Sequence, residues 1–491
     1  MYRYILVLLL LIGLELRIYR IESPLLDHHS WRQSDTADIT RNFYREGINP
    51  LYPRISSAGN LPGYVASEFP AYNSVVALLC RIFGFHERIG RLVSVAFSIA
   101  AAILVYLFAT EYFSRTAGLW TVFWFLISPY NIYFSRNFQP ESMLVFCSVA
   151  GIWFFSRWSR CGRHRELLLS WIFTVLALLI KITALYVFIP IFFLAWIKYH
   201  RETFRNPYLY VFVITSLFVS FAWYRHAHNL SLTGGAVFVD VCNGNSVWKL
   251  ITGTFPGEKP IWFQLKFYQG IFDRLWAGWL TLPGIILVVL GLGTRQDNSR
   301  QYLFHVWLAA FLLNIFFTGF ASWWHDYYQM PVMPPAAVLS GIACAEYIRP
   351  EIFRRILRRK EILTGVLVIG LPVAGFSVYH FTSIIDTMDR MYRLKKNVLE
   401  AGRITGRLTP VNALIVSVDD SPPELIYYSG RKGWHVYPGN VSPDLIEGYF
   451  SKGAGYVVAT SPEKIFSKLT PEFLCRHPVV YSARNEVIIR R

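Results

Sequence analysis

Long apolar segments with few charges recur along this chain as far as residue 381 and then stop. A helix needs about 20 apolar residues to cross roughly 30 Å of bilayer hydrocarbon, where its backbone must satisfy its own hydrogen bonds. We therefore expect an α-helical polytopic membrane protein with about eleven transmembrane helices. The expected spans cover residues 3–20, 89–112, 117–135, 141–158, 166–181, 184–199, 207–224, 276–293, 302–320, 329–348 and 362–381.

The composition agrees with a membrane protein. The chain is 54% hydrophobic and only 16% charged, which excludes an ordinary soluble globular protein. The net charge of +17 does not indicate nucleic-acid binding, because the basic residues lie in short segments between apolar runs. The six cysteines show no CxxC spacing, so they predict neither a zinc site nor a disulfide framework. No small-residue cleavage site follows the first apolar run, and we expect it to be a retained helix.

One further apolar segment, residues 69–84, decides the topology. Its 16 residues would rise only about 24 Å as a helix, and Arg81 lies inside it. If it lies flat on the membrane surface, one side of the membrane receives sixteen basic residues in short connections, and the opposite short connections carry only two, Arg136 and Lys181. Since Lys and Arg are retained in the cytoplasm, we expect residues 69–84 to be an interfacial helix within an external loop, residues 21–88.

The same rule fixes the location of both termini. We expect a multi-pass protein of the inner (plasma) membrane, with a cytoplasmic N-terminus and with residues 382–491 on the external, periplasmic side. Residues 1–381 would form the transmembrane domain, with a second large external loop at 225–275. That loop contains the amphipathic stretch IWFQLKFYQGIFDRLW, which predicts a helix resting on the membrane surface.

Polar residues gather on the predicted external face. Charges at span ends are common and each has an ordinary explanation as an interfacial residue, but acidic residues contribute little to topology and so are not explained by it. Lys181 is also unusual, as a basic residue on the side that otherwise avoids them. The candidate site residues are Asp35 and Glu68 in the first loop, Arg136 and Glu141 in the next external turn, Lys181 at a span end, and His325 in the segment SWWHDYYQ.

External carboxylates and a lysine beside a bilayer suit sugar transfer from a lipid phosphate. A carboxylate can accept the proton of an acceptor hydroxyl, for which Asp35, Glu141 and Glu68 are the candidates. A cation can stabilise the phosphate as it leaves, for which Lys181, Arg136 and His325 are the candidates. A divalent metal ion held by Asp35 and Glu141 is an alternative, although these positions lack a specific ligand spacing.

Five segments occur in order over the first 380 residues: WRQSDTADITRNF, EFPAYNSVVALLCRIFGFHERIGRLVS, SPYNIYFSRNFQPES, LALLIKITAL and HDYYQMPVMPPAAVLSG. Together they resemble the GT-C class of membrane glycosyltransferases, which use lipid-linked sugars. Within it, the chain is similar to the bacterial protein-mannosyltransferase and aminoarabinose-transferase-like proteins of glycosyltransferase families 39 and 83. The resemblance implies a GT-C-like transmembrane domain and a polyprenyl-phosphate sugar as donor.

The resemblance also implies residue roles. In that family, a first-loop acid is the proposed base or metal-site residue, a second acid lies in the next external turn, and a lysine near a later span contacts the lipid phosphate. These positions correspond to Asp35, Glu141 and Lys181. Many members have an acidic pair in the first loop, whereas Asp35 is flanked by Ser34 and Thr36, so Glu68 is the competing base. Members differ in metal dependence.

From residue 412 the pattern changes. Short β-rich runs alternate with helical ones, with Gly and Pro between them, which predicts a soluble α/β domain. Asp419 and Asp420 follow a predicted strand, where a turn or helix cap is the ordinary role.

We therefore expect an integral membrane glycosyltransferase that moves a monosaccharide to a lipid, glycan or protein acceptor. The alternatives are a transporter or flippase of lipid-linked saccharides, and a membrane scaffold or sensor whose tail binds a partner. A transporter predicts broken helices in matching halves of the chain, which the sequence does not suggest.

Overall fold

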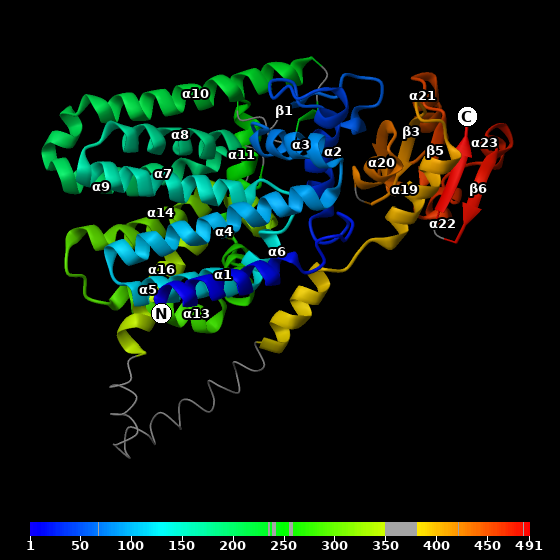
Figure 1. Ribbon diagram of the computed structural model, residues 1–491. Helices are drawn as coiled ribbons and strands as arrows, with labels where there is room; N and C mark the ends of the chain where they lie inside the picture. The colour runs from blue at the N-terminus through cyan, green and yellow to red at the C-terminus, as the bar shows by residue number, and fades with distance from the viewer. Residues whose placement is uncertain are drawn as a thin grey trace. The chain divides into compact units, whose positions relative to one another are not determined.

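The computed structural model describes residues 1–66, 68–233, 236–237, 242–254, 259–348, 381–420, 422–484 and 486–491 (Figure 1). Its contacts divide the chain into two compact units. The first unit comprises Met1–Ile21, Arg91–Trp223 and Val241–Asp389, and the second comprises Glu22–Gly90, Tyr224–Asp240 and Arg390–Arg491. Most of the expected last span, 362–381, lies outside the described residues.

The first unit is helical. Its longer helices are α1 (Tyr2–Ile18), α4 (Glu87–Tyr112), α5 (Arg115–Ile127), α6 (Pro129–Phe134), α7 (Glu141–Cys161), α8 (His164–Ile180), α9 (Phe188–Tyr199), α10 (Pro207–Leu232), α11 (Gly244–Thr252), α12 (Leu265–Arg274), α13 (Thr281–Gly293), α14 (Leu303–Phe317), α15 (Gly319–Trp324) and α16 (Met333–Tyr347). Short helical turns connect them: η2 (Ile182–Val187), η3 (His200–Arg205), η4 (Ile261–Phe263), the π-helix η5 (Leu275–Trp279), η6 (Ser299–Tyr302) and η7 (Asp326–Val332). Helix α7 packs against α8 and α9, and α16 packs against α5, α13 and α14.

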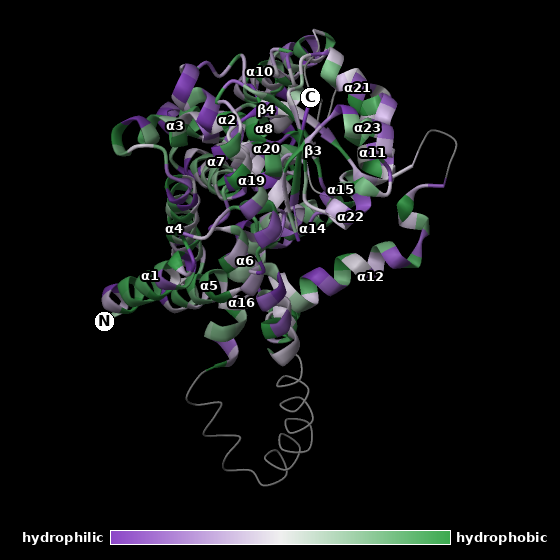
Figure 2. Cartoon of the chain, turned by 90° about the vertical axis from the view of Figure 1, so that its right-hand side faces the viewer, coloured by the Kyte–Doolittle hydropathy of each residue, from purple (hydrophilic) through white to green (hydrophobic). Residues whose placement is uncertain are grey.

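Helices occupy the expected spans up to residue 348, but several of them are broken. By length and hydropathy, four continuous helical stretches of the described residues can each cross a membrane: Glu87–Tyr112, Ile182–Arg205, Pro207–Leu232 and Ser299–Phe317. The pair Leu265–Trp279 and Thr281–Gly293 gives a fifth if its 100° bend lies within one span. The hydropathy view shows α1 as mainly hydrophobic, whereas α12 carries both kinds of residue, as its amphipathic sequence predicts (Figure 2). Eleven spans therefore stays a prediction.

The breaks have local causes. Helix α5 ends at Ile127, and Pro129 then begins α6, where proline is favoured because its missing N–H is not needed in a first turn. Helix α8 ends at Ile180, and the backbone of Lys181 is extended (φ −159°, ψ 120°) before the chain turns into η2. At each break, backbone N–H and C=O groups that a continuous helix would pair within itself are available for other contacts.

The second unit contains the first loop and the C-terminal residues. Its elements are α2 (Ser30–Glu46), η1 (Ser56–Ala58), β1 (Val65–Ala66), α3 (Ala71–Phe83), β2 (Ala236–Val237), α19 (Lys396–Leu408), β3 (Leu414–Val418), α20 (Glu424–Ser429), β4 (Lys432–Val436), η8 (Pro438–Asn440), α21 (Pro443–Ser451), β5 (Tyr456–Ala459), α22 (Pro462–Phe466), α23 (Pro471–Arg476), β6 (Val479–Ala483) and β7 (Glu486–Arg490). Helix α3 is the expected short helix. Its 13 residues are fewer than a span needs, and it packs against α2.

A five-stranded sheet forms the C-terminal part, as the alternating pattern predicted. Its strand order is β4-β3-β5-β7-β6, with β3 parallel to β4 and β5, and β7 antiparallel to β5 and β6. Because side chains alternate along a strand, Val416 and Val457 pack with α21, α22 and α23, while Ile415 and Val458 pack with α19 and α20. Leu26 of the first loop is buried in the second of these cores. The compact unit is thus discontinuous in sequence.

Candidate active site

Lys181 and Glu141 form an ion pair within the first unit. Lys181 Nζ lies 3.1 Å from Glu141 Oε1. The break between α8 and η2 presents the lysine, and the glutamate is the first residue of α7. Glu141 is 1% exposed, and a carboxylate at a helix N-terminus is favoured by the helix dipole. Two of the residues expected to form the site are therefore brought together from different helices.

Aromatic rings cover the lysine. Lys181 Nζ lies 3.6 Å from the centre of the Tyr328 ring and 4.8 Å from that of Tyr327. The His325 ring stacks on both tyrosines, with centroid distances of 5.3 Å to Tyr327 and 5.9 Å to Tyr328. A cation over an aromatic face is stabilised by the ring quadrupole. The segment from His325 to Tyr328 thus holds the ammonium group, with His325 one ring away from it.

An apolar cavity adjoins this ion pair. Lys181 and Glu141 line a small space together with Thr183, Asn314 and Tyr328. Thr183 and Asn314 also line a cavity of about 420 Å³. The rest of its lining is almost wholly apolar and comes from η2, α9, α11 and α14: Ile182, Leu185, Tyr186, Ile189, Val247, Ile251, Ala310, Leu313, Phe317 and Thr318. The ion pair and the cavity could therefore bind the charged group and the hydrocarbon chain of one molecule side by side.

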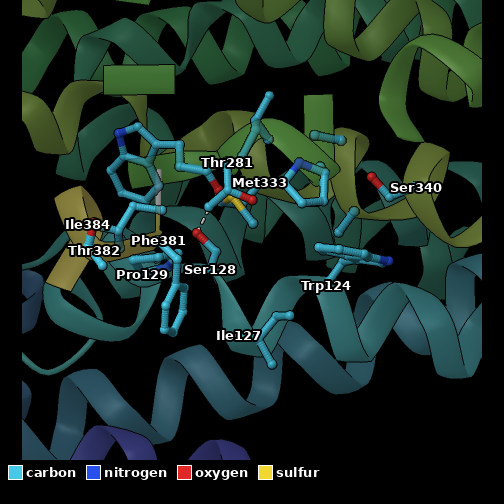
Figure 3. Close-up of a pocket in the computed structure, with 16 residues that line it drawn as sticks. Trp124, Ile127, Ser128, Pro129, Thr281, Met333, Ser340, Phe381, Thr382 and Ile384 are labelled. Atoms are coloured by element: carbon cyan, nitrogen blue, oxygen red, sulfur yellow. Dashed lines mark hydrogen bonds between the residues drawn. The ribbon is translucent and has the colours of Figure 1, made fainter. Parts of the chain in front are cut away.

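A second apolar cavity, of about 470 Å³, lies elsewhere in the first unit (Figure 3). Trp124 and Ile127 line it from α5, Met333 and Ser340 from α16, and Phe381 from the start of the range 381–420. Its polar groups are largely engaged with the chain itself. The Ser128 hydroxyl, for example, donates to the carbonyl of Trp279 at 2.7 Å. None of the residues that line this cavity is charged, so it offers no charged group to a ligand.

The structure adds residues that the sequence did not single out. Arg274 Nε donates to Asp326 Oδ1, and the Trp279 indole donates to the Asp326 carbonyl at 3.2 Å. These contacts fix the segment that carries Tyr327 and Tyr328. The motif HDYY signalled the segment, but Arg274 lies about fifty residues earlier and carried no local signal.

Arg136 has a different environment. It is fully buried, and its Nη1 donates to the carbonyl of Arg20, just beyond the end of α1, at 3.1 Å. Arg91 Nη1 donates to the same carbonyl, also at 3.1 Å. This contact of Arg136 stabilises a turn, whereas the predicted role was binding of the donor phosphate together with Lys181.

Asp35 belongs to the second unit, on the buried part of α2. It is 2% exposed, and burial raises the pKa of its carboxyl well above the ordinary value. The Arg32 guanidinium lowers that pKa, while the negative charges of Asp38 and Glu424 raise it further. Within the described residues, the Asp35 carboxylate accepts no hydrogen bond and forms no ion pair. It is therefore suited to accept a proton from a substrate.

Glu68, the competing base, is already paired. Its carboxylate forms an ion pair with Arg32 Nη2, in the same unit. Asp38, one helical turn after Asp35, is also engaged: it accepts hydrogen bonds from Arg41 Nη2 at 2.6 Å and from the Ser56 hydroxyl at 3.0 Å. Asp38, the next acid after Asp35 in the first loop, thus has structural partners of its own.

The alternative role predicted for Asp35 and Glu141 was to bind a divalent metal ion. Hard divalent cations need several oxygen ligands, often carboxylates and water. The cluster around Glu141 offers one carboxylate, and that carboxylate faces the ammonium group of Lys181 at 3.1 Å. A charged lysine cannot be a ligand and repels a cation. The Glu141 cluster by itself therefore fits an anion better than a metal ion.

Comparison with known proteins gives the class of the fold. Residues 67–224 match the sequence model of the family described as dolichyl-phosphate-mannose-protein mannosyltransferase. No curated protein matches the sequence. Among solved structures, ArnT from Cupriavidus metallidurans bound to undecaprenyl phosphate superimposes with a TM-score of 0.70 at 14% identity, covering 98% of this chain and 97% of ArnT.

Two further structures are similar. The Archaeoglobus fulgidus oligosaccharyltransferase has a TM-score of 0.59 at 13% identity, over 93% of this chain and 68% of that one. The arabinofuranosyltransferase AftD from Mycobacteria has a TM-score of 0.53 at 12% identity, over the whole of this chain and 41% of AftD. At such low identity the similarity establishes the fold and not the substrate. As the sequence motifs predicted, this multi-pass membrane protein has the fold of the GT-C class of membrane glycosyltransferases.

Proposed function

We propose that this protein is an integral membrane glycosyltransferase that moves a monosaccharide from a polyprenyl-phosphate donor to an acceptor on the external side of the membrane. The observation that carries the proposal is the Lys181–Glu141 pair beside the cavity of about 420 Å³. A lipid phosphate combines an anion with a long apolar chain. The site offers a cation next to an apolar space that extends along helices.

Two similar structures support this donor class. ArnT from Cupriavidus metallidurans was solved with undecaprenyl phosphate, and the Archaeoglobus fulgidus enzyme AglB was solved with a dolichol-phosphate. In our proposal, Lys181 contacts the donor phosphate, and the residues that line the adjoining cavity contact the first part of the polyprenyl chain. We also propose for His325 and Arg136 the role predicted from the sequence, that of further cations at the donor site.

The transfer step follows from these roles. The acceptor hydroxyl oxygen forms a bond to the anomeric carbon of the sugar while the bond from that carbon to the phosphate oxygen breaks. The hydroxyl proton passes to a carboxylate, which we assign to Asp35, and polyprenyl phosphate leaves as an anion that Lys181 stabilises. Asp35 is preferred to Glu68 because Glu68 is paired with Arg32. Glu141 orients the lysine before the donor binds.

The location and boundaries belong to the same proposal. Residues 1–381 form the transmembrane domain of an inner-membrane protein with a cytoplasmic N-terminus, and residues 382–491 are external. The acceptor hydroxyl belongs to a lipid, a glycan or a protein.

The test uses purified protein and a panel of polyprenyl-phosphate monosaccharides, with release of polyprenyl phosphate as the measurement. We expect release with at least one sugar, and loss of release in Asp35→Asn and in Glu141→Gln at normal expression. Asp420→Asn and Glu111→Gln are matched controls, because these exposed or half-exposed acids pair with Lys464 and Arg160. Unchanged release in both site variants would refute the proposed site. Movement of the intact donor across vesicles without release would favour a transporter.

A further inference from the structure

The turn between α6 and α7 holds two buried side-chain amides that have no hydrogen-bond partner. Asn137 is 0% exposed and Gln139 is 1% exposed. Within the described residues, neither the oxygen nor the nitrogen of either side-chain amide forms a hydrogen bond. A buried polar atom without a partner destabilises the folded chain, and most such atoms are therefore paired. The unpaired amides of this turn thus call for a functional explanation.

Gln301, a buried glutamine of the same unit, shows the ordinary arrangement. Its Oε1 accepts a hydrogen bond from the Asp297 amide at 2.7 Å, and its Nε2 donates to the Tyr112 carbonyl at 2.8 Å. Both ends of this side chain are therefore satisfied by the protein. Gln139 is buried at least as deeply, but the described part of the chain gives its amide no such partners.

The backbone of the turn is nevertheless held firmly. The Ser94 hydroxyl of α4 donates to the Asn137 carbonyl at 2.7 Å and to the Gln139 carbonyl at 3.1 Å. The Gln139 amide N–H also donates to the Asn137 carbonyl at 2.7 Å. Arg136, the preceding residue, is tied to the Arg20 carbonyl. A fixed backbone that carries unpaired side-chain amides is a preorganised arrangement for binding a ligand.

The turn runs directly into the ion pair of the candidate site. Glu141 Oε1 faces Lys181 Nζ at 3.1 Å, whereas Glu141 Oε2 and the Ser142 hydroxyl have no hydrogen-bond partner among the described residues. Unpaired polar atoms therefore continue from Asn137 into the first turn of α7. In the proposed function Lys181 binds the donor phosphate, and the sugar is bonded directly to that phosphate. The cavity of about 420 Å³ is lined by neither Asn137 nor Gln139, so the sugar and the polyprenyl chain would occupy separate subsites.

Hydroxyl groups are the ligand chemistry that suits these amides. A side-chain amide offers N–H donors and a carbonyl acceptor, and a hydroxyl group can both donate and accept. An anionic group would pair only with the amide nitrogens, and a cationic group only with the oxygens. Several neighbouring hydroxyls on one uncharged ring can satisfy both kinds of atom. The turn is therefore matched to a neutral monosaccharide.

We infer that Asn137 and Gln139 form the subsite for the donor sugar and select a neutral monosaccharide through its hydroxyl groups. The inference rests on the proposed function for the place of the donor. Both amides are buried, so the side chains around them must move as the sugar binds, and hydrogen bonds to a matching sugar offset the cost of that movement. A sugar that lacks one of the hydroxyls leaves a buried amide unpaired and is rejected for that reason.

The test replaces each amide by an apolar side chain of similar shape, in Asn137→Leu and Gln139→Met. We expect kcat/KM for the preferred polyprenyl-phosphate sugar to fall on the order of tenfold in each variant, because hydrogen bonds to the sugar are lost. The affinity for polyprenyl phosphate, which carries no sugar, should stay unchanged. Deoxy analogues of the preferred sugar should be rejected less strongly by the variants than by the wild type. Undiminished rejection in both variants overturns the inference.

Thermal unfolding of the donor-free protein separates a binding role from a structural one. Gln139→Met removes an unpaired buried amide, so the unfolding temperature should stay the same or rise. Gln301→Met is the matched control, because it removes hydrogen bonds that the protein makes with itself. We expect this control to unfold at a lower temperature and to keep the wild-type preference among sugars. A lowered unfolding temperature of Gln139→Met would show that its amide is structural and would overturn the inference.

Binding measurements distinguish this inference from the proposed function. The wild type should bind a polyprenyl-phosphate monosaccharide more tightly than polyprenyl phosphate, and Gln139→Met should reduce that difference. This result without any transfer would support the sugar subsite and refute the proposed transfer reaction alone. Transfer with a sugar preference that both variants retain would refute the subsite and leave the proposed function standing.

Discussion

Lys181 Nζ lies 3.1 Å from Glu141 Oε1, although forty residues separate them in sequence. Each residue stands at a helix end, and the tyrosine rings of η7 cover the lysine. Without a donor, the glutamate is the anionic partner of the lysine. A donor phosphate would compete with Glu141 for the same ammonium group. Lys181 is therefore suited to exchange the glutamate for the phosphate as its anionic partner.

Lys181→Met should reduce the transfer rate on the order of 10²-fold, the usual cost of losing one group that stabilises developing charge. The methionine keeps the length of the side chain and removes the cation. Lys198→Met is the matched control, because Lys198 also lies over an aromatic ring, that of Trp158, at 4.7 Å. Steady-state rates with the best donor of the panel measure the effect. Equal losses in the two variants would show that a general cation–π contribution is responsible.

Asp35→Asn should stabilise the protein at neutral pH while abolishing transfer. The folded-state pKa of Asp35 is raised above its unfolded value, so burying the charged carboxylate costs stability at pH values above the folded pKa. As the pH falls below the folded pKa, the carboxyl is protonated and the cost shrinks, and it is gone below the unfolded pKa. The gain in unfolding temperature of Asp35→Asn should therefore shrink in acid. A variant less stable than wild type at pH 7 would contradict the assigned desolvation.

Leu313→Trp should weaken donor binding, because Leu313 lines the cavity beside Lys181 and a larger side chain would fill part of it. We expect a raised KM for the polyprenyl-phosphate donor. Leu312→Trp is the matched control: the two leucines are neighbours on α14 with similar exposure, 42% for Leu312 and 47% for Leu313, and Leu312 is not among the residues lining the cavity. Similar KM values for both variants would argue against this cavity as the lipid site.

Gly59→Ala should destabilise the protein by about 1–3 kcal/mol, the usual cost of overpacking. Gly59 has φ +64°, and a Cβ there would lie 2.0 Å from the Trp434 ring of the sheet domain. Gly430→Ala separates the two causes, since Gly430 has φ +65° and a Cβ added to it would meet no atom within 4 Å. Scanning fluorimetry should give a clearly larger loss for Gly59→Ala. Matching losses would mean that backbone strain alone is at work.

Thiol labelling of intact cells tests the topology. Cys161 and Cys475 are both exposed, whereas Cys80, Cys147 and Cys344 are buried, so an impermeant reagent has few competing targets. We expect labelling of Cys475, with weaker labelling of the half-buried Cys242, and none of Cys161, which follows from the charge asymmetry of the loops. Labelling of permeabilised cells confirms that Cys161 can react. Strong labelling of Cys161 before permeabilisation would reverse the orientation.

The helices up to residue 348 and the alternating C-terminal sheet follow local patterns of the sequence. Two such patterns are apolar runs long enough to span a membrane and period-two alternation. Both are properties of neighbouring residues and do not depend on the rest of the chain. The short helix α3 could be predicted for the same reason, from its length and Arg81. The helix breaks at Ser128 and Lys181 were less visible, because the apolar runs continue through them.

The sequence by itself determined which residues could act: Asp35, Glu141 and Lys181 are polar groups that neither topology nor helix propensity explains. Only the tertiary structure decided their partners. It paired Glu141 with Lys181, occupied Glu68 with Arg32, and packed α20 against α2, the helix of Asp35. Such pairings join residues that lie far apart in the sequence, and local periodicity carries no information about them. They depend on how whole helices and a discontinuous unit pack, which is a property of the entire chain.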